Sequence, residues 1–255
     1  MQTAVTAPVV FILLFLAAFI AGLVDSIAGG GGLITVPVLL GIGLPPQAAL
    51  GTNKLQASFG SGSAMLTFIR SGTVELRECL RGIVFTAIGA GMGTFAVQLI
   101  DPAFLRQIIP FLLISIVFYS IMTPRLGAED IHPRMKSGPF FLVFGLALGF
   151  YDGFFGPGTG SFWVMALMLG LGFNMTKATG YTKVLNFTSN FLSLLLFMVS
   201  GAVHWREGLV MGFGQFIGAR VGSRMVIMKG TRFIRPIFIS MVLAITIRLI
   251  WQNYH

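Results

Sequence analysis

Four consecutive glycines, Gly29 to Gly32, interrupt one of the most apolar stretches of the chain. Glycine destabilises a helix because its backbone loses more conformational freedom on ordering than that of any other residue. The run therefore predicts a helix that breaks inside an apolar environment. Asp25 precedes the run, a short apolar segment (33–44) follows it, and Asn53 and Lys54 come soon after.

The composition predicts an integral membrane protein. Of the 255 residues, 55% are hydrophobic and 10% are charged, whereas soluble domains carry about 25% charged residues. The net charge of +9 comes from basic residues in short loops, as expected of cytoplasmic loops, so nucleic acid is not an expected partner. Residues 1–21 carry no charge, which favours a first membrane helix over a cleaved signal peptide.

The hydrophobic pattern predicts an all-α, polytopic fold. The apolar segments of the first half are 8–27, 33–44, 47–69, about 80–100 and 103–122. Segment 33–44 is too short to span a bilayer alone, since a span needs about 20 residues. Whether it crosses or re-enters stays open. Small residues in the third and fourth segments favour close helix packing.

The second half of the chain repeats the first. Asp25 aligns with Asp152 at an offset of 127 residues, and from Gly41 onward the offset is 129. The aligned pairs are Gly41/Gly170, Gly43/Gly172, Ala49/Ala178, Lys54/Lys183, Gly72/Gly201, Gly89/Gly218, Ala90/Ala219, Gly93/Gly222, Phe104/Phe233 and Arg106/Arg235. We therefore expect one transmembrane domain of two repeats, 1–122 and 139–255, joined by a cytoplasmic linker, 123–138.

Three basic clusters predict the orientation of the halves. The first follows segment 47–69, the second lies in the linker, and the third lies in the expected loop before the last segment. In that order they are Arg70, Arg77 and Arg81; Arg125, Arg134 and Lys136; and Arg220, Arg224, Lys229, Arg232 and Arg235. Corresponding loops would then face opposite sides of the membrane. This predicts inverted repeats, an architecture of secondary transporters that bind their substrate near the midplane.

Four ionisable residues fall inside apolar segments: Asp25, Asp152, Lys54 and Lys183. Such a residue costs about 2.5–3.5 kcal/mol on insertion scales, so it usually has a partner and a function. One interpretation is a structural Asp–Lys ion pair that pins each glycine hairpin to the following segment. The other is that the lysines, beside Asn53 and Thr182, contact a substrate. In that case Asp25 or Asp152 either couples transport to protons or only orients the lysines.

The glycine loops suggest the charge of that substrate. Gly29, Gly30, Gly31, Gly156 and Gly158 would leave backbone N–H groups at the start of a broken helix, where anions bind. Tight helix packing is the alternative explanation for these glycines. Lysines and helix N-termini together favour a small oxyanion.

Several neutral polar residues in the same segments are candidates for hydrogen bonds to the anion, or for contacts between helices. They are Asn53, Gln56, Ser58, Ser61, Thr182, Asn186, Ser189 and Asn190. Gln98 and Gln215 are candidates for lining a transport path.

No cofactor or metal is expected. Cys79 is the only cysteine, and His132, His204 and His255 fall in expected loops or at the terminus. The stretch GPGTGS is not followed by the GK[ST] of a nucleotide-binding loop. An intramembrane enzyme using Ser26 or Ser161 would need a nearby base, and no histidine is embedded, so an enzyme is not expected.

Three motifs resemble those of a known family. They are DSIAGGGGL at 25–33, GTNK at 51–54 and GFYDGFFGPGTG at 149–160. The chain resembles, over nearly its whole length, the TauE/SafE sulfite exporter family of bacterial membrane proteins. The resemblance implies a multi-pass protein of the bacterial inner membrane that exports sulfite, sulfonates or related organic anions. By position, it points to the glycine motifs and to the steps Asn53-Lys54 and Thr182-Lys183, although the second half has Tyr181-Thr182 where the first has Thr52-Asn53.

The sequence thus predicts a secondary transporter of small anions that works by alternating access, with a passive anion channel as the alternative. Its expected partners are a small anionic substrate and the lipid bilayer. A homodimer is left open as its assembly state.

Overall fold

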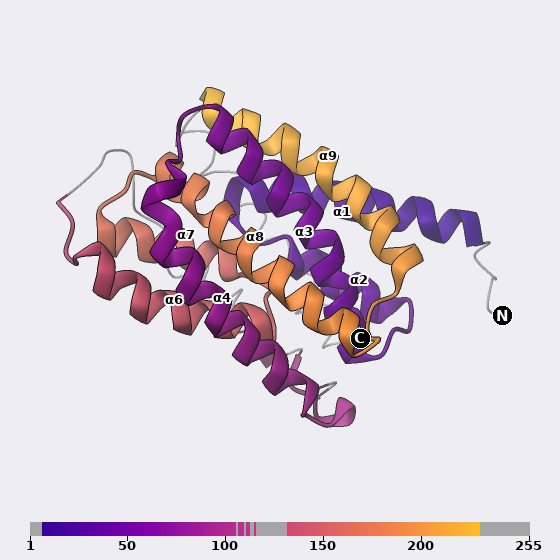
Figure 1. The fold of residues 1–255 in the computed structure, drawn as a ribbon. Coiled ribbons are helices and arrows are strands. Elements are labelled where there is room, and N and C mark those ends of the chain that lie inside the picture. The colour runs from indigo at the N-terminus through magenta and orange to yellow at the C-terminus, as the bar shows by residue number, and fades with distance from the viewer. Residues whose placement is uncertain (1–6, 106, 110, 113–114, 116–131, 230–255) are drawn as a thin grey trace.

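The computed structural model describes residues 7–105, 107–109, 111–112, 115 and 132–229 (Figure 1). Within this part of the chain the structure is helical, without strands, so the all-α prediction is confirmed. The helices are α1 (Ala7–Ala28), α2 (Gly32–Gly41), α3 (Pro46–Arg70), α4 (Leu76–Gln98), α6 (Ser137–Phe154), α7 (Thr159–Leu171), α8 (Met175–Val199) and α9 (Trp205–Lys229).

The helices differ in their ability to cross a bilayer. Four of the described helices, α1, α4, α6 and α8, contain stretches long and apolar enough to cross a membrane. Helices α3 and α9 have 25 residues each but a more polar composition. Helices α2 and α7 have only 10 and 13 residues, so at 1.5 Å per residue each reaches about half of the roughly 30 Å hydrocarbon core.

The glycine motifs do break helices, as predicted. The first break separates α1 from α2 and the second separates α6 from α7. Each half therefore begins with a long helix, followed by a half-length helix and two more long helices.

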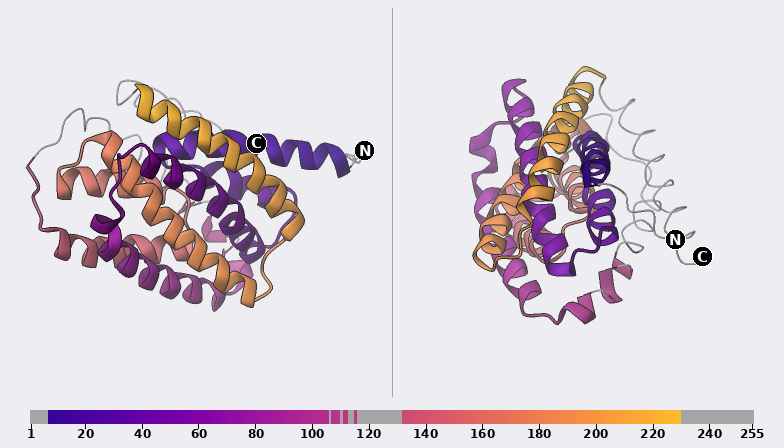
Figure 2. Two further views of the ribbon diagram at one scale, coloured as in Figure 1. Left: turned by 45° about the horizontal axis from the view of Figure 1, so that its top comes forward. Right: turned by 90° about the vertical axis from the view of Figure 1, so that its right-hand side faces the viewer.

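The long helices pack in a continuous order: α1, α9, α3, α8, α4 and α6 (Figures 1 and 2). Helices α3 and α8 lie at the centre of this order and are antiparallel. The Thr52 hydroxyl, near the start of α3, accepts a hydrogen bond from the backbone N–H of His204, just before α9. Tyr181, near the start of α8, donates to Glu78 at the start of α4. The two contacts occupy equivalent places in the two halves.

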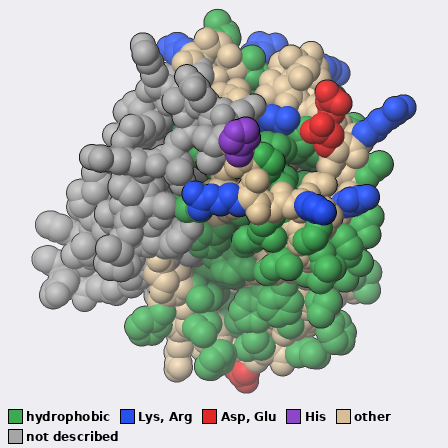
Figure 3. Space-filling view, turned by 90° about the vertical axis from the view of Figure 1, so that its left-hand side faces the viewer, with side chains coloured by type: hydrophobic (Ala, Val, Ile, Leu, Met, Phe, Trp, Pro, Cys, Tyr) green, Lys and Arg blue, Asp and Glu red, His purple; other side chains and the backbone are tan. Residues whose placement is uncertain are grey.

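The outer surface carries apolar stripes. On α4, Leu80, Val84, Ile88, Met92 and Phe95 recur at helical spacing and are each about half exposed or more. Exposed apolar area of this extent marks a surface covered by another apolar phase. The face in Figure 3 shows a broad apolar region in its lower half, with Lys and Arg side chains confined to the part above it. Both features fit a protein embedded in a bilayer.

One expectation about the basic residues is wrong. Arg220, Arg224 and Lys229 lie within α9 and not in a loop. The remainder of that cluster lies outside the described residues, as do the last segment of the second half and parts of segment 103–122 and linker 123–138. The division into 1–122, 123–138 and 139–255 stays a prediction.

The outer helix pairs pack backbone to backbone at glycines. A Cβ atom on Gly218 of α9 would lie 2.0 Å from the carbonyl oxygen of Phe19 on α1, and one on Gly93 of α4 would lie 2.0 Å from that of Phe150 on α6.

We expect Gly218→Ala to lower the free energy of unfolding by about 1–3 kcal/mol, because the obstructing atom belongs to a backbone. Gly41→Ala is the matched control, since its Cβ would meet nothing within 4 Å. Thermal unfolding in detergent measures both, and equal melting temperatures would contradict this packing.

Candidate functional site

The two broken helices cross at their glycine loops. The backbone N–H and the hydroxyl of Ser161 both donate to the carbonyl oxygen of Gly29, at 3.1 Å each. A Cβ on Gly29 would lie 2.4 Å from the carbonyl carbon of Gly160, and Gly29 has a φ of +78°. Only glycine combines this backbone conformation with this close approach. The loops from the two halves therefore form one contiguous centre.

Two buried ion pairs flank this crossing. The Lys54 ammonium on α3 lies 2.6 Å from the Asp152 carboxylate on α6, and the Lys183 ammonium on α8 lies 3.0 Å from the Asp25 carboxylate on α1. Each lysine thus pairs with the aspartate of the other half. The hypothesis that pairs pin each hairpin to its own following segment is wrong in its choice of partners.

The Lys54–Asp152 pair is fully hydrogen-bonded. The Lys54 ammonium donates to the carbonyl oxygen of Asp152, to its carboxylate and, at 3.2 Å, to the amide oxygen of Asn190. These three bonds use all three of its N–H donors. The hydroxyl of Ser189 donates to the other carboxylate oxygen of Asp152. Both charged side chains are at most 4% exposed.

The Lys183–Asp25 pair is less enclosed. Lys183 donates to the backbone and carboxylate oxygens of Asp25, and the backbone N–H of Gly31 donates to the second carboxylate oxygen at 3.2 Å. The Asp25 side chain is 16% exposed. At the position equivalent to Ser189, the first half has Gly60, so no equivalent hydroxyl is available to Asp25. The two pairs are related but not equivalent.

A polar cavity of about 30 Å³ lies between the pairs. By the volume that one buried water needs, it has room for roughly two water molecules. Its lining residues are Asp25, Gly29, Gly32, Asn53, Ala57, Asp152, Gly156, Gly158, Thr159, Gly160, Asn186, Asn190 and Gln215.

The structure separates the predicted site residues into two groups. Those that line the cavity are Asn53, Asp25, Asp152, Gly29, Gly156 and Gly158. Those that do not are Lys54, Lys183, Thr182, Gly30 and Gly31. The Thr182 hydroxyl is buried and has no hydrogen-bond partner among the described residues. The Gly31 amide is occupied by Asp25, so the hairpin's own carboxylate takes the place expected for a substrate anion.

The sequence predicts some of the residues that line the cavity and not others. Gln215 was expected beside a path and lies in the cavity wall, whereas Gln98 donates to the Thr94 carbonyl oxygen and does not line it. Thr159 and Gly160 were not predicted as site residues. The sequence feature that identifies these two residues as candidates is their position within the second glycine motif.

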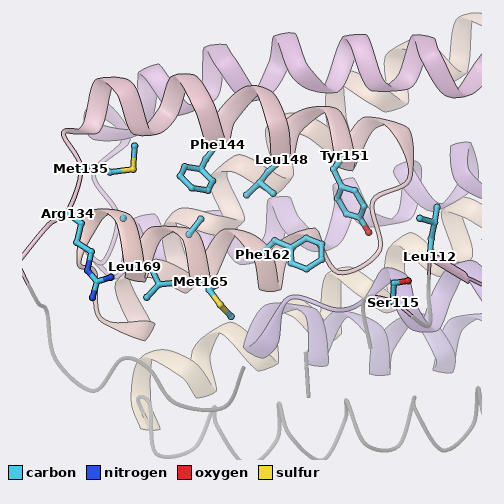
Figure 4. A pocket seen from close by; sticks show the side chains of 12 residues that line it. Leu112, Ser115, Arg134, Met135, Phe144, Leu148, Tyr151, Phe162, Met165 and Leu169 are labelled. Atoms are coloured by element: carbon cyan, nitrogen blue, oxygen red, sulfur yellow. The ribbon is translucent and has the colours of Figure 1, made fainter. Parts of the chain in front are cut away.

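Two further cavities differ in character. One of about 700 Å³ is mainly apolar: side chains of α6, including Phe144, and of α7, including Phe162, face one another, with Arg134 at one end (Figure 4). None of the predicted site residues lines it. Another, of about 510 Å³, lies at the ends of α3 and α9 and is lined by Arg70, Arg220 and Arg224 without an acidic residue among its described lining.

The buried pair gives a stability prediction. Lys54→Met leaves Asp152 buried without its cation, and we expect a loss of about 3–5 kcal/mol in unfolding free energy. The double variant Lys54→Met/Asp152→Leu removes both charges and should recover most of that loss. The control is Lys177→Met, whose exposed pair with Glu78 spans 3.9 Å and should be worth about 0–1 kcal/mol. Thermal denaturation in detergent measures all three, and a double variant less stable than Lys54→Met would contradict the pairing.

The chain is similar in sequence to known membrane proteins over most of its length. The family model described as "Sulfite exporter TauE/SafE" matches residues 14–249. A protein from Sinorhizobium sp, "Probable membrane transporter protein ORF9", is 48% identical over 242 residues, covering 95% of this chain and 93% of that protein. "Probable membrane transporter protein YfcA" of Escherichia coli strain K12 is 46% identical over 248 residues, covering 97% and 92%. A "Probable membrane transporter protein" of Haemophilus influenzae is 45% identical, covering 94% of each chain. No solved structure matches the chain.

Proposed function

Because the chain belongs to the sulfite exporter TauE/SafE family and its relatives are named as probable membrane transporters, we propose that it is a secondary transporter of small oxyanions. Sulfite and sulfonates are the proposed substrates, and the bacterial inner membrane is the proposed location. The names of the relatives point to transport and not to catalysis.

One observation carries the proposal: two reciprocal Lys–Asp pairs flank a polar cavity at the crossing of two broken helices. Helix breaks at membrane depth are tolerated where they line a cavity or are buried in protein. Ionisable residues at that depth mark substrate and ion pathways. Transporters with broken helices bind substrate at the interface of their repeats.

We further propose that the halves are inverted repeats that move against each other in alternating access. The antiparallel arrangement of α3 and α8 supports this. So do the Thr52–His204 and Tyr181–Glu78 hydrogen bonds, which occupy equivalent places in the two halves. Both ion pairs bridge the halves, so their geometry would change in any such movement. The pairs are therefore placed to link substrate binding to the motion.

The basic end of the molecule supports an anionic substrate. The cavity lined by Arg70, Arg220 and Arg224 has no acidic residue among its described lining. Positive charge at a cavity mouth raises the local concentration of anions and their rate of entry.

Transport by purified protein in liposomes tests the proposal. We expect saturable uptake of radiolabelled sulfite, accelerated when unlabelled sulfite is preloaded inside, because a carrier exchanges substrate. Competition by thiosulfate, isethionate, acetate and chloride defines the preferred anion. Empty liposomes are the control. Flux that does not saturate and shows no acceleration by preloading would instead indicate the passive anion channel.

The two aspartates should differ in coupling. Asp25 is the more exposed carboxylate, whereas Asp152 is enclosed by Lys54 and Ser189, so we propose that Asp25 carries the coupling proton. Asp25→Asn keeps an oxygen facing Lys183 but leaves that buried ammonium without its counter-ion, so we expect a less stable protein that still exchanges sulfite, with its stimulation by a pH gradient reduced about tenfold or more. Asp152→Asn should instead reduce the yield of folded protein. Unchanged stimulation in Asp25→Asn would contradict this role.

A further inference from the structure

Four carboxamide side chains line the central cavity: Asn53, Asn186, Asn190 and Gln215. All four are more than nine-tenths buried, with exposed fractions of 3%, 5%, 8% and 2%. A buried carboxamide normally has hydrogen-bond partners, and one left without them costs free energy. Their partners therefore indicate what the cavity accommodates.

Two of these carboxamides have a fixed orientation. The Asn53 amide oxygen accepts from the Thr35 hydroxyl and from the Gln56 amide, at 2.6 Å each. The Asn190 amide oxygen accepts from the Lys54 ammonium at 3.2 Å. With both oxygens engaged, the NH2 groups are the ends left for the cavity. Neither NH2 group has a hydrogen-bond partner within the described chain.

The other two carboxamides have no protein partner. The amide oxygens of Asn186 and Gln215 are buried without a hydrogen bond among the described residues. No hydrogen bond of either side-chain NH2 group is found in the same part of the structure. Each can therefore turn an N–H donor toward a ligand without breaking a contact in the protein.

The lysines are poorly placed for the role expected of them. Lys54 has no N–H left, since all three are used within the protein. Lys183 uses two of its three on Asp25. Neither lysine lines the cavity. Apart from the Thr159 hydroxyl, which donates to the carbonyl oxygen of Gly156, the side-chain donors among the described lining residues are carboxamides.

We propose that the NH2 groups of Asn53, Asn190, Asn186 and Gln215 bind the oxygens of the transported anion. This inference rests on the proposed function and names the chemistry of its substrate site. The charges of the two lysines and two aspartates sum to zero, so the site binds an oxyanion through neutral donors. The cavity is small, about 30 Å³, so the site favours compact substrates that carry several oxygens on one small centre, as sulfite does, and halides lack the oxygens that such donors orient.

Two isosteric variants test the fixed donors. Asn53→Asp keeps an oxygen for Thr35 and Gln56, and Asn190→Asp keeps one for Lys54, but each replaces the NH2 donor with an acceptor. A hydrogen bond to a charged group contributes about 1.5–3 kcal/mol, so we expect each variant to weaken sulfite binding by about tenfold or more. The readout is protection from thermal unfolding across a sodium sulfite titration of the full chain in detergent.

Neutral variants separate loss of a donor from added negative charge. Gln215→Met and Asn186→Leu remove an amide that holds no protein partner, so they should fold normally and still weaken sulfite binding. The matched control is Asn174→Asp, since Asn174 caps α8 by accepting from the Lys177 backbone N–H at 2.9 Å, and aspartate caps equally well. This control should bind sulfite as the wild type does.

The outcomes distinguish the two proposals. Wild-type protection by sulfite but not by sodium chloride, weakened in the carboxamide variants alone, supports the assignment. Equal protection of wild type and all four variants would overturn the assignment and leave anion transport standing. A wild type that is protected by no anion and transports none would overturn both.

Discussion

The buried Lys–Asp pairs are the constraint on which the rest of the centre depends. A lone ammonium or carboxylate at this depth would cost several kcal/mol, so neither lysine nor aspartate can be placed without its partner. Since each pair joins one half to the other, the halves must meet at the depth of the broken helices. The loops can approach this closely only because Gly29 and Gly160 carry no Cβ. The ion pairs and the glycine packing thus both place the contact between the halves at the crossing of the broken helices.

The two ion pairs differ because the residues around their carboxylates differ. A serine at position 189 and a glycine at the equivalent position 60 give Asp152 a hydroxyl donor that Asp25 lacks. The side chain of Gln215 occupies the space over Gly60, where a Cβ would lie 2.5 Å from its Cγ. One substitution therefore encloses one carboxylate and brings a carboxamide into the cavity beside the other. The two half-sites are therefore similar in sequence but differ in the hydrogen bonds that they give to their carboxylates.

The sequence was sufficient to predict the helical membrane fold, the breaks at the glycine motifs and the four central charges. Hydropathy, glycine runs and charge within apolar segments are local signals, and duplication marked which of them belong together. The exchange of partners between Lys54 and Lys183 was not predictable, because spacing along one half says nothing about which half supplies the counter-ion. Likewise, the use of every N–H of Lys54 depends on Asn190, which lies far along the chain. A lysine beside an asparagine therefore suggested a substrate contact, whereas the protein occupies that lysine itself.

Zero net charge at the centre matters for a carrier. A site with two free ammonium groups would hold an oxyanion strongly and release it slowly, since affinity changes act mostly on the rate of dissociation. With the ammonium groups held by aspartates, the neutral donors of the proposed site would provide direction and selectivity at lower affinity. In the proposed transport cycle, a singly charged oxyanion that enters adds one negative charge, and a proton taken up by Asp25 would cancel it. Electroneutrality in a low-dielectric centre then favours joint occupancy, so the same ion pairs that let the halves meet also give a reason for anion and proton to move together.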